Sequence, residues 1–261
     1  MFTFMNASVH TFQLDQYILH HVMDSHEWHL PFLPPIELPH FLSLHGLMVI
    51  LCALFLLILF CGFYRKKDRV PTGITNLLEA FVQFIRDEIA VPSLGEHEGE
   101  RLTPLLCTFF FFILVLNLMG QIPIFSVATA NISVTAPLAL VTFYLMTVGA
   151  IRKNGIGGFI KAFVPSGVPA LVLILIIPLE ILGVFIKTFA LMVRLFANML
   201  AGHMVILSLL GLIVLFGVWA LPAIVLAVGI SLLEILVVFL QAYIFVLLSA
   251  VFIGQMYHPE H

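Results

Sequence analysis

Residues 169–256 form an almost wholly apolar run, and this run constrains the fold more than any other feature. Its best break lies between Gly211 and Pro222, which leaves two segments of about 40 residues each. A 40-residue α-helix is ~60 Å long, about twice the ~30 Å hydrocarbon core of a bilayer. Two straight helices of this length, perpendicular to the membrane, therefore do not fit within the hydrocarbon core. Each segment is either one helix that is strongly tilted or bent, or a pair of shorter helices.

Composition extends this conclusion to the rest of the chain. Of its 261 residues, 62% are hydrophobic and 10% are charged, whereas a water-facing surface needs far more charge. We expect an all-α polytopic membrane protein with about five membrane-embedded helices and one amphipathic surface helix. The last two membrane helices are expected to be long and tilted, as a hairpin over 169–256. Residues 41–261 then form a single helical membrane domain after a His/Pro-rich segment, 1–40, that faces outside.

Three further spans are predicted before the hairpin, at about 41–64, 103–125 and 134–151. Between the first two, residues 72–92 carry apolar side chains at helical spacing with charged residues interleaved. This pattern is typical of a helix that lies on the membrane surface or against a partner helix. A short acidic loop is predicted over 95–101, and a Gly/Pro-interrupted connection over 156–168 leads into the hairpin.

The placement of Lys and Arg predicts the orientation. With these spans, the basic residues outside the hairpin fall on one side of the membrane: Arg65 to Arg69, Arg86, Arg101, Arg152, Lys153 and Lys161. The N-terminal segment and the loops near 126–133 and 211–220 carry none. The N-terminus is therefore expected outside, and the C-terminus in the cytoplasm or matrix. The run 65–69 is better explained as a topology anchor than as a nucleic-acid site.

Arg194 is the residue of the hairpin whose placement in the membrane is energetically most costly. Its guanidinium stays charged at any biological pH, and burying it at bilayer depth costs roughly 2.5–3.5 kcal/mol on insertion scales. Glu180 and Lys187 precede it at seven-residue intervals, so the three share one stripe that drifts by about 40°. Asn198 lies close to this stripe, one turn on. Such a charge indicates function and requires an anionic partner.

The second long segment carries Glu234 and Gln241, seven residues apart and therefore on one face. In a regular antiparallel hairpin the numbers of facing residues have a nearly constant sum, so His203 faces Glu234 and Arg194 faces Gln241. Carboxyl and imidazole groups relay protons, whereas Arg cannot deprotonate. Arg194 would therefore interrupt a proton path between polar groups that lie toward opposite sides of the membrane. By the same rule, Glu180 is expected near Tyr257.

Less specific interpretations stay open for these residues. Glu180 and Lys187 can form an internal ion pair without functional consequence, and His203 and Glu234 a structural hydrogen bond. In the His-rich N-terminal segment, residues 26–29 contain two histidines at a spacing that suits zinc, but no second pair at a firm spacing. We therefore expect no metal and no cofactor.

Several stretches resemble signatures of ATP synthase subunit a, the membrane stator of the F-type proton-driven synthase. These stretches are 76–80, 117–123, 129–135, 178–180 and 194–203. The resemblance covers about residues 70–256, and the motif that starts at Arg194 is its most specific part. The chain departs from many members at Thr188, where they have proline. At His203 and Glu234, some bacterial members have the acid and the imidazole exchanged.

The resemblance implies a stator that faces a ring of c subunits, each with a mid-membrane carboxylate that partners Arg194. It implies proton-translocation roles for six residues: Arg194 between two offset half-channels, Asn198, His203, Glu234 and Gln241 along the outer one, and Glu180 in the inner one. Proton flow then drives rotation, ATP is made elsewhere in the complex, and the chain itself is not catalytic. Further implied partners are b-type peripheral stalk subunits and the lipid bilayer. The implied location is a bacterial or mitochondrial inner membrane.

Two other function classes are weaker. An autonomous ion-coupled secondary transporter with a midplane site is the main alternative, but it requires repeat symmetry, and residues 1–155 and 156–261 show none. An intramembrane enzyme is not supported, because the sequence contains no nucleophile–base pair and no HExxH motif.

Overall fold

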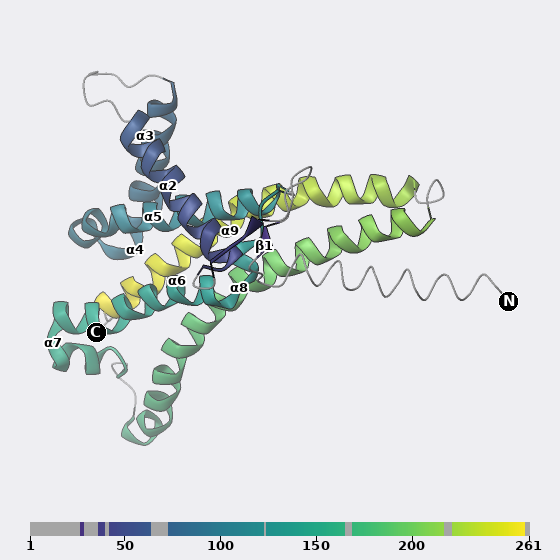
Figure 1. Cartoon of the computed structure of the whole chain (residues 1–261). Coiled ribbons are helices and arrows are strands. Elements are labelled where there is room, and N and C mark those ends of the chain that lie inside the picture. The colour runs from purple at the N-terminus through teal and green to yellow at the C-terminus, as the bar shows by residue number, and fades with distance from the viewer. Residues whose placement is uncertain are drawn as a thin grey trace. The chain divides into compact units, whose positions relative to one another are not determined.

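The structure, a computed structural model, is almost entirely helical where it describes the chain (Figure 1). It describes residues 27–28, 36–39, 42–63, 73–122, 124–164, 169–216 and 221–258. Five of its helical stretches are long and apolar enough to cross a membrane: Leu44–Gly62, Glu96–Gly120, Ile132–Lys161, Leu171–Leu212 and Pro222–Tyr257. The prediction of an all-α polytopic membrane protein is confirmed. Most of the His/Pro-rich segment and the basic run 65–69 lie outside the described residues.

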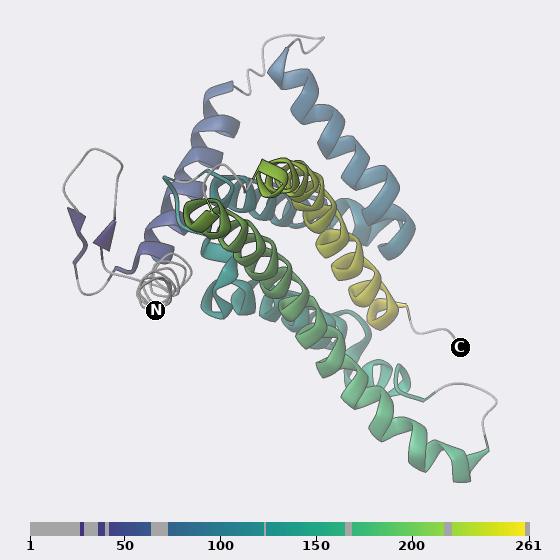
Figure 2. The same ribbon diagram turned by 90° about the vertical axis from the view of Figure 1, so that its right-hand side faces the viewer.

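A two-stranded hairpin precedes the first span, and the sequence analysis did not anticipate it. Strand β1 (Glu27–Trp28) pairs antiparallel with β2 (Ile36–Glu37), with Trp28 opposite Ile36 (Figure 2). The indole Nε1 of Trp28 donates a hydrogen bond to the carbonyl oxygen of Ile124 at 2.9 Å. This bond attaches the hairpin to the turn that follows the second span.

Helix α2 (Leu44–Phe63) matches the span predicted over 41–64. Its start is fixed by Ser43, whose hydroxyl oxygen accepts a hydrogen bond from the backbone N–H of Gly46 at 3.2 Å, as an N-cap residue does. His45, in the first turn, is buried, and its Nδ1 lies 3.0 Å from Nδ2 of Asn131. This contact joins the start of α2 to the start of the third span.

The predicted surface helix is present as one helical stretch, made of α3 (Ile74–Phe84), the π-helical η1 (Ile85–Ala90) and α4 (Val91–Leu94). The burial pattern agrees with an amphipathic helix in part. Leu78, Ile85 and Ile89 are buried, and the charged residues Glu79, Arg86, Asp87 and Glu88 are exposed. Three apolar residues of the stretch are exposed as well: Ile74, Leu77 and Phe84.

The prediction of an acidic loop over 95–101 was wrong. Helix α5 (Glu96–Gly120) includes all of this segment except Gly95. Gly95 has φ 80°, a left-handed conformation that favours glycine, and it separates α4 from α5. The acidic residues are compatible with helix because Glu96 and Glu98 lie in the first turn, where the helix dipole stabilises negative charge.

The third span ends close to the predicted position, and the expected connection over 156–168 is partly helical. It consists of α6 (Ile132–Tyr144), the π-helical η3 (Leu145–Gly149) and α7 (Ala150–Lys161), with non-helical dihedrals at Gly155 (φ 70°, ψ 171°). The spanning helix breaks at Gly155, directly after the polar residues 152–154, and a separate helical segment then runs on to Lys161. The side chain of Asn154 donates hydrogen bonds to the carbonyl oxygens of Met256 and Tyr257, both at 3.2 Å.

The two long segments are each one helix, α8 (Ala170–Phe216, 47 residues) and α9 (Leu221–Tyr257, 37 residues). At 1.5 Å per residue they are ~70 Å and ~55 Å long, which answers the question that the sequence left open. Helix α8 continues through Thr188, whose hydroxyl donates to the carbonyl oxygen of Val184 at 3.0 Å.

The chain divides into two compact units, each built from three separate stretches. The first is Met1–Ala53, Leu114–Val134 and Leu195–Gln241, and the second is Leu54–Ile113, Thr135–Arg194 and Ala242–His261. The division passes through both long helices, immediately after Arg194 in α8 and after Gln241 in α9.

Candidate functional site

Arg194 is exposed on α8, in the middle of the helix. Among the described residues, none forms an ion pair or hydrogen bond with its guanidinium. The neighbouring positions on the same helix face are small and also exposed: Ala190, Ala197 and Ala201. Small residues let another helix approach closely in a membrane. The cation is therefore open to a partner that is not part of the described chain.

Glu234, on α9, is buried, with 5% of its surface exposed. Its carboxylate lies against Gly202 of α8, where an added Cβ would be 2.5 Å from Oε1 and 3.0 Å from Cδ. A side chain at that position would require the end of the Glu234 side chain to shift. Gly202 immediately precedes His203, so the contact agrees with the hairpin register predicted from the sequence.

The buried carboxylate of Glu234 lacks hydrogen bonds within the part of the chain that the structure describes. Neither carboxylate oxygen has a hydrogen-bond partner among the described residues. Gln121, just after α5, is the side chain that approaches the carboxylate, although its geometry falls short of a hydrogen bond. Gln241, two turns further along α9, is also buried, and its Nε2 has no partner in the described part of the chain.

Two more buried polar residues of the same unit share this property, and the sequence analysis did not identify them as site residues. Asn117 is fully buried with neither side-chain polar atom bonded, and the hydroxyl of Thr129 is buried and unbonded within the described residues. Leaving such groups unsatisfied costs ~1–3 kcal/mol each, and ordered water is their usual partner. The sequence signal was available for Asn117, which is a polar residue inside an apolar span.

Asn198 and His203 complete the predicted set on α8 in this unit. Both side chains are half-buried, four and nine residues after Arg194. The unit therefore contains four of the six predicted proton-translocation residues: Asn198, His203, Glu234 and Gln241.

Glu180 belongs to the second unit and has different surroundings. Its Oε1 lies 3.7 Å from the Nζ of Lys187, and 44% of its side chain is exposed. The Lys187 ammonium also donates to Oε1 of Gln255 at 3.0 Å and lies 5.9 Å from the ring centre of Phe252. The proposed internal ion pair therefore forms.

Tyr257, the expected neighbour of Glu180, has other contacts. Its hydroxyl lies against Gly149, and the Lys153 ammonium lies 5.0 Å from the centre of its ring. The pairing of Glu180 with Tyr257 stays a prediction. Among the described residues, no group of three or more His, Cys, Asp or Glu side chains is arranged to hold a metal ion.

Comparison with known proteins identifies the family. Residues 46–254 match the family profile described as ATP synthase A chain. The ATP synthase subunit a of Chloroherpeton thalassium is 48% identical over 259 residues, which cover 93% of this chain and 77% of that protein. The subunit a of Myxococcus xanthus is 46% identical, covering 83% and 75%.

A relative from Anaeromyxobacter dehalogenans, also named ATP synthase subunit a, is 51% identical over 80% of this chain. This chain spans 56% of the length of that protein. The resemblance seen in the sequence motifs is thus confirmed over most of the chain. The chain belongs to the ATP synthase subunit a family.

Proposed function

We propose that this multi-pass membrane subunit of ATP synthase forms two offset proton half-channels against a c-ring, so that proton flow drives rotation. The exposed guanidinium of Arg194, which has no partner among the described residues, is the observation that carries this proposal. A permanent cation at bilayer depth needs an anion. A carboxylate on each ring subunit supplies one, and the small residues beside Arg194 leave room for the ring helix to approach.

The outer half-channel passes Glu234. A buried carboxylate whose oxygens accept no hydrogen bond from the described residues is poised to exchange protons with water. His203, Asn198 and Gln241 extend this polar path within the same unit. The unbonded polar atoms of Asn117 and Thr129 add sites where water would be held.

The inner half-channel uses Glu180, which is half-exposed and next to Lys187. Between the two paths, Arg194 attracts the deprotonated ring carboxylate and so favours proton release. Since Arg cannot release its own proton, it also prevents a direct leak. The chain contributes proton translocation, and the synthesis of ATP takes place elsewhere in the complex.

The proposed partners and orientation follow from the same function. A c-ring and b-type peripheral stalk subunits assemble with the chain in a bacterial or mitochondrial inner membrane. The N-terminus faces outside, and the C-terminus faces the cytoplasm or matrix, because Arg152, Lys153 and Lys161 gather at one end of a span.

The decisive experiment is Arg194→Lys in the complete complex in sealed vesicles with an imposed proton gradient. Synthesis of ATP is expected to fall by about 100-fold or more, as after loss of an electrostatic group aimed at a reacting charge, because a Lys point charge does not replace a guanidinium. Lys187→Arg, seven residues away on the same stripe, is the matched control and should keep most activity. Full synthesis in the Arg194→Lys variant would contradict the proposal.

Assembly is checked in the same preparations. The c-ring and a b-type subunit are expected to copurify with both variants in normal amounts. If the chain purifies as an active monomer that transports an ion without other subunits, the alternative of a secondary transporter is correct instead.

A further inference from the structure

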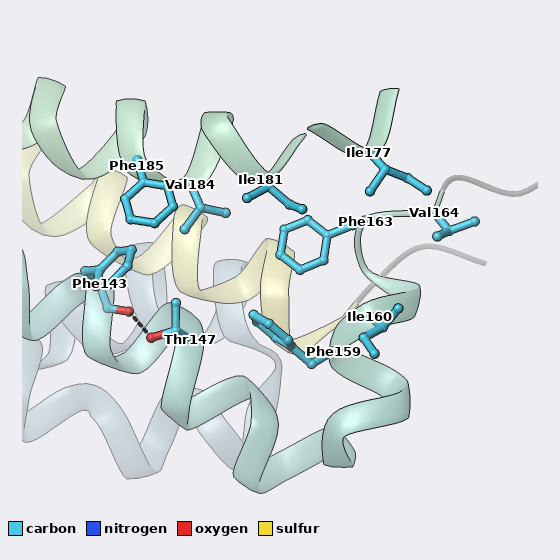
Figure 3. A pocket seen from close by; sticks show the side chains of 10 residues that line it. All are labelled: Phe143, Thr147, Phe159, Ile160, Phe163, Val164, Ile177, Ile181, Val184 and Phe185. Carbon is cyan, nitrogen blue, oxygen red and sulfur yellow. Dashed lines mark hydrogen bonds between the residues drawn. The ribbon is translucent and has the colours of Figure 1, made fainter. Parts of the chain in front are cut away.

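A groove in the second unit contains none of the six residues proposed for proton translocation. It has a volume of about 360 Å³ and lies between residues 177–185 of α8 and the stretch from α6 to the residues just after α7. Figure 3 shows Ile177, Ile181 and Phe185 of α8 along one wall, facing Phe143, Thr147 and Phe159 on the other. Cavities of ~300–1,000 Å³ are the usual size for sites that bind small molecules.

The walls of the groove present apolar surface only. Thr147 is the single polar residue among those that line it, and its hydroxyl donates to the carbonyl oxygen of Phe143 at 2.8 Å (Figure 3). The aromatic pairs Phe143–Phe185 and Phe159–Phe163 have ring centres 5.3 Å and 5.0 Å apart. An occupant is thus held by dispersion and apolar burial, without hydrogen bonds.

The groove opens away from the protein core. Ile160, Ile181 and Phe185 are exposed, whereas Val184 and Phe163 are buried beneath them. These residues belong to stretches long and apolar enough to span a membrane, or directly follow one. An outward-facing apolar hollow in such a position is suited to a lipid chain.

Positive charge lies next to the groove. Lys161 directly follows Ile160, a lining residue, and is exposed. No ion pair joins Lys161 or Arg152 to any described residue. The sequence contains no Asp or Glu from residue 101 to residue 179. Basic residues beside pockets between membrane helices suit anionic lipid headgroups.

The acidic residue closest in sequence to the groove lies on a different face of α8. Glu180 is about 85° around the helix from the mean direction of the four α8 lining residues. Its carboxylate is paired with Lys187. The groove and the polar stripe of α8 are therefore separate features.

We propose that this groove binds an acyl chain of an anionic phospholipid, whose phosphate is held by Lys161. The apolar lining selects the chain, and the uncompensated positive charge selects the headgroup. The lipid site does not depend on the half-channels, so the experiment below tests it separately from the proposed function.

The test uses the complete complex in vesicles that contain a trace of phospholipid with a photoactivatable diazirine on its acyl chain. The probe is either phosphatidylglycerol, which is anionic, or phosphatidylcholine, which is not. After irradiation, lipid adducts on residues 143–164 and 170–186 are quantified by mass spectrometry. We expect adducts at the groove, with about fivefold more from phosphatidylglycerol, the effect of one Lys near an anionic lipid.

Matched variants locate the site. Ile181→Trp fills the groove and should lower the adduct yield at least fivefold, whereas Leu182→Trp, exposed on another face of the same helix turn, should not. Val164→Trp fills the groove from the opposite wall and guards against a local effect of Ile181→Trp on folding. Lys161→Gln should remove the preference for phosphatidylglycerol, and Lys161→Arg should retain it.

Three results would overturn the proposal. The first is an equal yield from wild type and both groove-filling variants. The second is an equal yield from the two lipids in the wild type. The third is cross-linking of a photoreactive amino acid at position 181 to another protein subunit in place of lipid, which would make the groove a protein interface.

Discussion

The two glutamates of the long helices have opposite surroundings. Glu180 has 44% of its side chain exposed and lies 3.7 Å from the ammonium of Lys187. Glu234 is 5% exposed, lies against a glycine, and receives no hydrogen bond from the described residues. From the sequence, both are simply acids in an apolar run.

This difference distinguishes a charge that the protein itself neutralises, at Glu180, from a buried carboxylate that it does not neutralise, at Glu234. The pairing of Glu180 with Lys187 explains how its charge is tolerated, whatever else it does. Within the described structure Glu234 has no ion pair, and Gln121 approaches its carboxylate without forming a hydrogen bond. Burial of such a polar group is costly. Its presence therefore requires water or a proton, and we expect Glu234 to be the more sensitive of the two positions.

The largest predicted effect comes from removing each carboxylate while keeping its shape. Glu234→Gln should slow passive proton conduction by about 100-fold, the lower range for loss of a positioned proton-transfer group. Glu180→Gln should slow it by about tenfold or less, because water reaches its half-exposed position. Conduction is measured with a pH-sensitive dye in vesicles that carry the membrane sector alone. A larger loss for Glu180→Gln would reverse the comparison.

The next effect tests the close packing of Glu234. Gly202→Ala places a carbon 2.5 Å from its Oε1, so the carboxylate must shift. Because the end of this side chain is flexible, the stability loss should be at the low end of the ~1–3 kcal/mol typical of overpacking. Proton conduction should fall because the carboxylate is displaced. Gly183→Ala is the control on the same helix, since nothing lies within 4 Å of its added Cβ. The control should be neutral or slightly stabilising. Thermal unfolding of the purified complex gives the stability, and equal effects at the two glycines would contradict the packing.

A smaller effect is expected from the partner of Glu180. Lys187→Gln removes the ion pair, and stability should change by less than about 1 kcal/mol, as for other partly exposed pairs. Proton conduction should stay within about twofold of wild type, because Glu180 remains accessible to water. A loss as large as that of Glu180→Gln would show that the pair works as a unit.

The smallest effect concerns Asp87, a carboxylate of the surface helix. The pKa of Asp87 is lowered, mainly by the hydrogen bond that its carboxylate accepts from Arg86 at 2.7 Å. The stability from this pair is complete above the usual Asp pKa of about 3.9 and is lost as pH falls through the lowered value. Both side chains are exposed, so Asp87→Asn should leave the unfolding temperature unchanged at neutral pH. A clear decrease there would contradict this assignment.

Sequence periodicity predicted most of the fold, because apolar patterning directly reflects which segments lie in lipid. It located α2, the surface helix and both long helices. It failed at 95–101 and after Gly155, where helix was not expected. Negative charge in the first turn of α5 explains the first case. In the second case a helical segment resumes after the kink at Gly155. The contact of Asn154 with the end of α9 joins residues far apart in sequence and leaves no periodic signal.

The candidate site was predictable only as far as charge and spacing allow. Arg194 and Glu234 were identifiable as ionisable groups in apolar runs, and the constant-sum rule gave the register that the Gly202 contact supports. Gly202 and Gln121 lie in stretches that resemble the family, but their approach to Glu234 was not identifiable, because one has no side chain and the other is far from Glu234 in sequence. The spacing also gave no indication that Glu234 is buried and Glu180 half-exposed.

The missing side chain at position 202 also links two positions in the evolution of related sequences. The carboxylate of Glu234 occupies the place where a Cβ at 202 would lie. A lineage that replaced Gly202 first would have to displace this carboxylate, whereas one that first shortened residue 234 would not. Substitutions at these two positions are therefore coupled. A shorter residue at 234 is expected to make a later change at 202 easier.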